Sequence, residues 1–471
     1  MRPYKLQNHA LPAILILLTF SWSTTSSQEL IESSPAPHPL QNTEAASQES
    51  DGSYDSETDP AGRPLTLDAA LRLATVRNPA LVAKRKELGI AEGELRQAAI
   101  YFQNNPEISV GLDRLRVPSP SGSERFTEFE VELSQEFEIF GQPRARRKAA
   151  DAARETVLAD IAATVWEVLS GVRSEFYAAQ IALGRLRLAE DQFQFGNAVL
   201  ELSKRQLDAG DIAPTEYRQL QIQMAELRTK HLSARAELAS ALDILRLSLG
   251  YGSTESIDLV DVLQTPTGLP FSAETFVGMV FDVYPRLRHA GLVMEQRERE
   301  FTLVKKEGKP NVTGSVFTGR EEDDDEFYGI ALAVPLPLFN RNQGSRAAAK
   351  AAIDVAKAQL RYFENALRTQ AQTAFTRLAI SQEAASYYYE GVLPAVQTNI
   401  EQLENAFRQG EIGMLELRIN QRDLLDAQTA ALDALAEYYE QRAQVEGLMG
   451  RSLSVNLSTD SQLHEESSDA P

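Results

Sequence analysis

The most informative absence from this 471-residue sequence is cysteine, of which it contains none. Disulfides, thiolate metal sites and a lipid anchor on a cysteine are therefore not expected. Histidine is scarce as well, and the five histidines are scattered without metal-ligand spacing. No Gly-rich phosphate loop and no Ser/His/Asp arrangement is recognisable. We predict no catalytic residue, no cofactor and no metal site.

Basic charge and long apolar runs are also lacking. The chain has 47 Lys and Arg against 67 Asp and Glu, a net charge of −20. This balance argues against nucleic acid as a partner, because phosphate binding needs a basic surface. Beyond the N-terminal segment, no stretch approaches the roughly 20 apolar residues of a membrane-spanning helix. If the protein enters a membrane, it must do so as strands.

The two ends of the sequence read as segments outside the fold. Residues 1–27 resemble a secretory signal, with basic Arg2 and Lys5, an apolar core at Leu11–Phe20 and small residues after it. A single membrane anchor is the alternative, but the apolar run is short for one. Residues 28–62 and 455–471 are polar and aperiodic, which predicts a disordered leader and tail.

An internal repeat organises the remaining sequence. Residues 207–212 recur at 407–412, and Gly210 corresponds to Gly410 at an offset of 200 residues. The offset persists downstream to Gly250 and Gly450. We therefore predict two structural repeats, at 63–262 and 263–454, that build the same unit within one fold.

Each repeat begins with helices and ends with a long helical hairpin. A helix at 65–77 is interrupted by Asn78-Pro79, because the residue before proline avoids helical geometry. The predicted hairpins run along 144–207 and 215–249 in the first repeat, and along 345–407 and 415–449 in the second. Gly210 and Gly410 mark the turns. Such hairpins are rods, and the fold is therefore mainly α-helical.

Between these helices lie four predicted strands, at about 106–115, 127–140, 311–319 and 327–339. The second alternates apolar Phe129, Val131 and Leu133 with carboxylates, a period of two. The carboxylates are Glu128, Glu130, Glu132, Glu136 and Glu138. Polar loops are predicted at 117–124 and 320–326, the latter a solvated acidic loop in preference to a calcium site.

The strands have two interpretations. They could be soluble amphipathic hairpins packed on a helix. We favour a barrel with lipid outside and water inside, because the apolar faces are long and one opposite face is almost all carboxylate. Four strands cannot close a barrel, so closure requires several copies of the chain. The glutamates would then line the lumen and favour cations.

At this point the sequence resembles the outer-membrane factor family, the TolC-like channels of Gram-negative bacteria. Leu65–Leu71 leading to Asn78–Leu81 is similar to the opening helix of that family. Gln135–Gly141 with the following arginines, and Pro335–Gly344, are similar to its CzcC-type branch, which is associated with heavy-metal efflux. The resemblance covers about residues 64–455.

The resemblance implies a trimeric α/β barrel with four strands per chain, in contact with outer-membrane lipids, above a long helical tunnel through the periplasm. It also implies a periplasmic adaptor protein and an inner-membrane transporter of the resistance-nodulation-division type. The docking tips would be Gly210, Asp211, Gly410 and Glu411. Glu416 matches a carboxylate of the periplasmic aperture, whereas Ile412 stands where better-studied members carry arginine.

Four functions remain open at this stage. The sequence favours an exit duct of a tripartite pump for metal cations. A type I protein-secretion or drug-efflux duct is the near alternative, and a periplasmic helical scaffold outside the membrane is a more distant one. An enzyme is the least favoured class, because no constellation of groups supports one. The exported substrate and the gating mechanism are not encoded in any motif.

Overall fold

A computed structural model describes residues 64–453, except 120–121, 253–254, 260–265, 267–268, 321–324 and 410. The predicted signal, leader and tail, and Gly410, lie outside the described residues. The described chain is mainly helical with one four-stranded antiparallel sheet, as the sequence predicted. No described helix is long and apolar enough to cross a membrane.

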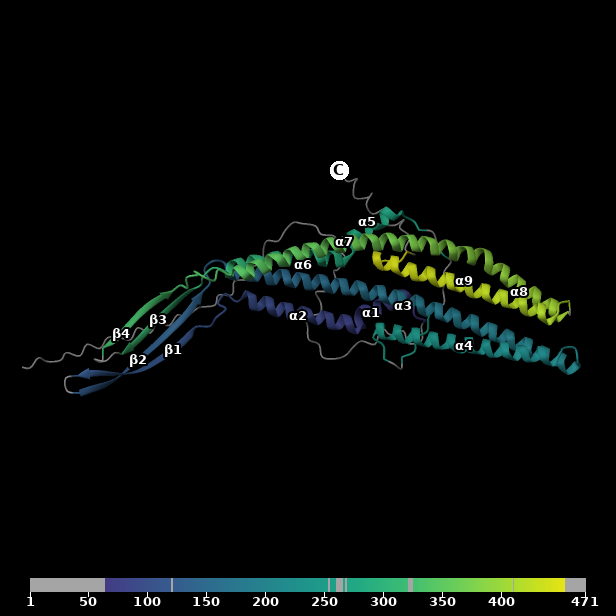
Figure 1. Cartoon of the computed structure of the whole chain (residues 1–471), viewed down its shortest axis with the longest axis horizontal. Helices are drawn as coiled ribbons and strands as arrows, with labels where there is room; N and C mark the ends of the chain where they lie inside the picture. The colour runs from purple at the N-terminus through teal and green to yellow at the C-terminus, as the bar shows by residue number, and fades with distance from the viewer. Residues whose placement is uncertain are drawn as a thin grey trace, which may run out of the picture. The chain divides into compact units, whose positions relative to one another are not determined.

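The second half of the chain repeats the element order of the first (Figure 1). The first half contains α1 (Leu67–Arg77), α2 (Pro79–Ala99), β1 (Glu107–Ser119), β2 (Gly122–Phe137), α3 (Gln142–Ala209) and α4 (Pro214–Leu249). The second contains α5 (Ala273–Val283), α6 (Pro285–Glu307), β3 (Val312–Arg320), β4 (Glu326–Ala333), α7 (Gln343–Ser386), α8 (Leu393–Arg408) and α9 (Met414–Met449).

The break between the first two helices of each half has a local cause. Asn78 ends α1, and its side-chain oxygen accepts from the N–H groups of Ala80 (3.0 Å) and Leu81 (3.2 Å) at the start of α2. Its amide nitrogen donates to the carbonyl of Ser248 on α4 at 2.8 Å. Tyr284 and Pro285 separate α5 from α6 at the corresponding place, with proline again beginning the second helix but without a side-chain cap. The predicted interruption at Asn78-Pro79 is therefore confirmed.

The strand bounds differ from the predicted ones. β1 and β2 remain paired as far as Ser119 and Gly122, so most of the predicted loop at 117–124 is strand. The predicted strand at 327–339 ends as β4 at Ala333. Pro335 and Pro337 explain this end, because proline has no N–H to donate to a sheet. β2 likewise ends at Phe137, before the predicted limit.

The two junctions from strand to long helix are built alike. Gly141 precedes α3 with φ 81°, and Asn342 precedes α7 with φ 59°, both in the left-handed region. The next residue is glutamine in each case, and its side-chain oxygen folds back. Gln142 accepts from the N–H of Phe140 and Gln343 from the N–H of Arg341, both at 2.8 Å. The duplication is therefore visible at the level of single hydrogen bonds.

The long helices pair as antiparallel hairpins, α3 with α4 and the segment α7–α8 with α9 (Figure 1). The second hairpin is not the unbroken helix that was predicted, because a π-helical turn at Tyr387–Val392 separates α7 from α8. Gly391 lies in that turn and Pro394 follows it. Proline has no backbone N–H to donate to a carbonyl of the preceding turn. The missing hydrogen bond favours a local rearrangement of the helix.

A buried ionic cluster lies within the main core. Glu446 of α9 is 0% exposed and accepts from Arg442 Nε (2.9 Å), Tyr177 Oη (3.0 Å) and the N–H of Leu453 (2.9 Å). Arg173 of α3 lies 3.7 Å from the same carboxylate. Burial raises the pKa of Tyr177, and the nearby carboxylate raises it further, so the hydroxyl remains a donor. The cluster fastens α3, α9 and the segment after α9 together.

Two further ionic links join helices on the surface. Asp160 of α3 contacts Lys84 of α2 at 2.6 Å and Arg286 of α6 at 2.8 Å. Arg185 of α3 contacts Glu237 of α4 at 2.6 Å and Asp433 of α9 at 2.9 Å. Arg185 thereby connects the first helical hairpin to the second.

Candidate functional site

One face of the sheet is apolar across all four strands and is not covered by any other part of the described chain. The register places Val131 opposite Val110, Leu133 between Ile108 and Val316, and Ile330 opposite Val316. Ile330 is 82% exposed and Leu332 78% exposed. Exposed patches of this kind on a folded protein mark contact with an apolar environment or partner. Val334, also apolar and exposed, lies beyond the end of β4.

The opposite face carries carboxylates along β2. Alternation places Glu128, Glu130 and Glu132 on that face. Within the described residues, none of these three side chains has a hydrogen bond or an ion pair. Asp113 of β1 stands directly opposite Glu128. Like charges in this position destabilise a sheet, so sheet stability does not explain them. The pairing register of β1 and β2 is what shows that Asp113 lies on the same face as the three glutamates.

Glu136 and Glu138, the other two predicted lumen residues, are engaged at the junction with the helices. Glu136 accepts from the side-chain amides of Asn104 and Asn311, the latter at 2.7 Å. Gln142 in turn donates to Asn311 at 3.0 Å. Glu138 follows the end of β2 and forms an ion pair with Arg146 of α3. These contacts make both carboxylates part of the joint between sheet and helices.

The far ends of the two hairpins form matched turns. Gly210 has φ 81°; its N–H donates to Leu207 at 3.0 Å, and Asp211 N–H donates to Gln206 at 2.8 Å. In the second turn, Glu411 N–H donates to Ala406 at 2.9 Å, the same bond at the offset of 200 residues. The glycine supplies the left-handed conformation that this helix end requires. Asp211 and Glu411 are both exposed.

An apolar contact joins the ends of the two hairpins near their turns. Val199 of α3 and Leu220 of α4 are buried there, with Leu403 and Ile412 of the second hairpin packed against them. Glu416 stands in the first turn of α9 and is exposed. A carboxylate in this position also stabilises the helix start, which is a structural reason for its presence. The packing role of Ile412 was not apparent from the sequence.

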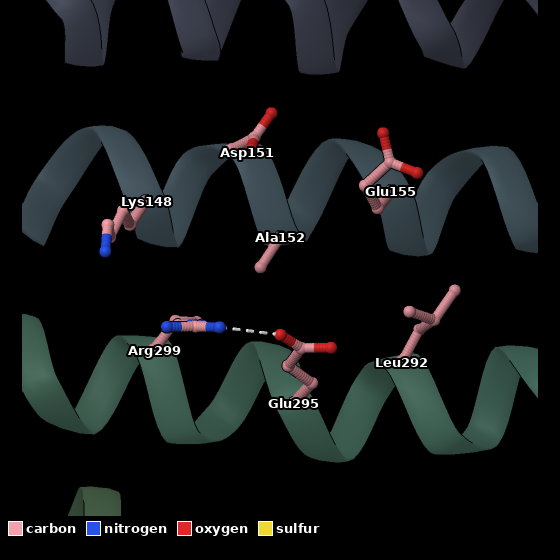
Figure 2. Close-up of a pocket in the computed structure, with 7 residues that line it drawn as sticks. All are labelled: Lys148, Asp151, Ala152, Glu155, Leu292, Glu295 and Arg299. Atoms are coloured by element: carbon pink, nitrogen blue, oxygen red, sulfur yellow. Dashed lines mark hydrogen bonds and ion pairs between the residues drawn. The ribbon is translucent and has the colours of Figure 1, made fainter. Parts of the chain in front are cut away.

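A polar pocket with charged walls lies between α3 and α6 (Figure 2). It has a volume of about 220 Å³ and is lined by Lys148, Asp151 and Glu155 of α3 and by Glu295 and Arg299 of α6. Arg299 pairs with Glu295 at 2.9 Å, and the carboxylates of Asp151 and Glu155 do not converge with Glu295 on one point (Figure 2). No metal-ligating cluster occurs among the described residues.

The chain is similar to proteins of one family. A family model described as "Outer membrane efflux protein" matches residues 70–251 and 284–451. The cobalt-zinc-cadmium resistance protein CzcC of Cupriavidus metallidurans is 26% identical over 83% of this chain and 91% of its own length. The nickel-cobalt-cadmium resistance protein NccC of Alcaligenes xylosoxydans xylosoxydans is 25% identical over 65% of this chain and 68% of its own length.

Solved structures show the same fold. The outer-membrane channel OprN superposes with a TM-score of 0.69 at 17% identity, covering 82% of this chain and 90% of that one. The arrangement of sheet, hairpins and matched turns is therefore one that outer-membrane channels adopt.

Proposed function

The chain belongs to the outer membrane efflux protein family, and from that premise we propose that it is the exit duct of a tripartite pump that exports metal cations. Membership makes it an outer-membrane protein and places it among efflux channels, not enzymes. The observation that carries the proposal is the sheet, with an uncovered apolar face on one side and, on the other, carboxylates that pair with no side chain the structure describes. Lipid suits the first face and a water-filled lumen suits the second.

The duct would close as a homotrimer. The strand order leaves β1 and β4 at the two edges of the sheet. Unpaired backbone groups at such edges cannot face lipid, so they must pair with strands of other copies. Three chains joined edge to edge would form one barrel, and their α-helical hairpins would continue it as a tunnel. We infer that the turns lie at its periplasmic end.

The periplasmic end would bind the partners of the duct. We propose that a periplasmic adaptor contacts the turns at Gly210 and Asp211 and at Gly410 and Glu411, and links the duct to an inner-membrane transporter of the resistance-nodulation-division type. Glu416, near the second turn, would belong to the aperture. Matched turns at the ends of both hairpins support this assignment, because they present equivalent surfaces around a trimer.

Metal cations are the proposed substrate class. The relatives are named for resistance to cobalt, zinc, cadmium and nickel, and the acidic sheet face favours cations. The test is deletion of the gene in its native host. If the deletion strain fails to grow in medium that contains salts of these metals, and the gene on a plasmid restores growth, the proposal is supported. Sensitivity to drugs alone, or loss of a secreted protein, would support the alternative duct functions instead.

The first prediction concerns ion selectivity. In planar bilayers under a salt gradient, the aperture-opened channel should be cation-selective, because fixed carboxylates concentrate cations. Replacing Glu128, Glu130 and Glu132 together with glutamine should move the reversal potential toward zero. The effect should weaken at high salt as the Debye length shrinks.

A matched control removes equal charge elsewhere. Glu94, Glu226 and Glu440 are helical carboxylates, and their replacement with glutamine should shift the reversal potential less. A wild-type channel without selectivity at low salt, or an unchanged strand variant, would contradict the assignment of the acidic face to the lumen.

The second prediction concerns the turns. Gly210→Val should leave trimers intact but abolish metal export, because the residue has φ 81° and a β-branched side chain is strained there. A Cβ atom added at Gly210 would have no other atom within 4 Å, so the strain comes from the backbone conformation and not from a steric clash. Metal resistance and cross-linking to the adaptor are the measurements.

Gly93→Val on α2 is the control for the turn variant. Its Cβ position is equally open and its φ is not in the positive region, so export should persist. Normal adaptor cross-linking and export in the Gly210 variant would show that this turn is not a docking surface.

A further inference from the structure

The segments that join the sheet to the helices have the opposite charge to the rest of the chain. Residues 138–150, 302–311 and 338–350 contain ten Lys and Arg but only two Asp and Glu. Their net charge is +8 in a chain whose total is −20. The charge is therefore segregated at one level of the molecule, where the strands meet α3, α6 and α7 (Figure 1).

Most of these basic side chains form no ion pair with a carboxylate that the structure describes. Arg146 is paired with Glu138. Eight others are exposed and have no ion pair to any residue that the structure describes. These are Arg144, Arg147, Lys148, Lys305, Lys309, Arg341, Arg346 and Lys350, which we call the basic collar. Unpaired charges of one sign repel one another, so the collar lowers the stability of the chain alone unless an anion lies nearby.

Helix stabilisation does not explain the collar. Arg144 and Arg346 lie close to the N-termini of α3 and α7, and neither helix has an acidic residue in its first turn. The N-terminus of a helix carries partial positive charge, so acidic residues are favoured there and basic ones are not. The same inversion occurs in both halves of the duplicated chain.

Exposed aromatic and apolar side chains border the collar on the side of the sheet. Phe339, after β4, is 92% exposed, and Tyr101 and Phe102, before β1, are also exposed. Phe102 packs edge-on against Phe137 of β2, with ring centroids 5.8 Å apart. Lys309 lies over the ring of Phe140 at 5.0 Å. Aromatic rings beside long basic side chains, next to an apolar face, are typical of a membrane–water interface.

We propose that the basic collar binds the phosphate headgroups of anionic glycerophospholipids in the leaflet that faces the helices. This inference rests on the proposed function, because it takes the apolar sheet face to span the membrane. Each basic side chain held near an anionic lipid surface strengthens association by roughly fivefold. The collar would fix the depth of the sheet in the bilayer and enrich anionic lipid around it.

The test measures which lipids surround the reconstituted full chain. Wild-type protein is placed in phosphatidylcholine vesicles that contain trace spin-labelled phosphatidylglycerol or spin-labelled phosphatidylcholine. The immobilised fraction of each label in the electron paramagnetic resonance spectrum gives its relative association constant. We expect a several-fold preference for phosphatidylglycerol at low salt, decreasing as salt is added.

Two matched triple variants identify the residues responsible. Arg144→Gln, Lys309→Gln and Arg346→Gln together should bring the preference close to unity. Arg228→Gln, Lys230→Gln and Arg235→Gln remove the same charge from exposed positions on α4 and should leave the preference unchanged.

Two outcomes would overturn the inference. One is a wild-type protein without lipid preference; if the collar variant then also loses its trimers, a second copy of the chain is the occupant. The other is a preference that persists in the collar variant. Ion conductance in the same vesicles reports insertion separately. A conducting protein without lipid preference refutes the collar while leaving the proposed duct intact.

Discussion

The Leu332→Arg variant should fail to assemble in the outer membrane. Leu332 lies on β4, is 78% exposed, and shares the apolar sheet face with Ile330 and Val316. If that face contacts lipid, an arginine near the bilayer midplane destabilises the assembled barrel by roughly 2–4 kcal/mol. Val131→Arg on β2 should have the same effect. The measurement is the yield of heat-modifiable trimers extracted from the outer-membrane fraction.

Glu130→Arg is the control for this variant. Glu130 is adjacent to Val131 in β2 but lies on the opposite, acidic face, where water should surround an added arginine. Its trimers should therefore form at near wild-type yield. Equal damage from Glu130→Arg and Leu332→Arg would contradict the assignment of lipid and water to the two faces. Assembly of all three variants would favour the interpretation of the sheet as part of a soluble scaffold.

The Glu446→Ala variant should lose roughly 3–5 kcal/mol of folding stability, because it leaves buried arginines without a counter-charge. Arg442 and Arg173 are buried beside Glu446, at 2.9 Å and 3.7 Å from its carboxylate. Burial lowers the pKa of Arg442, but the attraction of Glu446 and Tyr177 together outweighs that effect, so the pKa is raised overall and the guanidinium stays charged. Thermal unfolding of the detergent-purified trimer, followed by circular dichroism, gives the effect.

Two variants separate charge from packing at this position. Glu440→Ala, on an exposed position of α9, should change the unfolding temperature little, because surface substitutions rarely exceed about 0.5 kcal/mol. Glu446→Gln keeps the shape and should fall between Glu440→Ala and Glu446→Ala. An unfolding temperature of Glu446→Ala equal to that of Glu440→Ala would show that the cluster adds no net stability.

The sequence by itself determined the order and kind of the elements. A strict period of two identified β2 because successive strand residues point to opposite faces, and Asn78-Pro79 located a helix break because proline restricts the residue before it. The long helices and the two turns followed from helical periodicity ending at glycine, although the π-helical turn at Tyr387–Val392 was not predicted. These signals depend only on residues close together in the sequence, and similar signals occur in both repeats.

The tertiary structure decided the features that depend on residues distant in the chain. Alternation placed all five glutamates of the predicted second strand on one face, but Asn311 and Arg146 engage Glu136 and Glu138, and no local pattern indicates these contacts. The pairing of Asp113 with Glu128 requires the register of two strands. Glu446 looked like one of many helical carboxylates until α3 brought Arg173 and Tyr177 to it. A buried carboxylate of this kind stabilises the fold through its ion pairs, whereas an exposed one is solvated by water. Which carboxylates are buried is decided only when the helices pack.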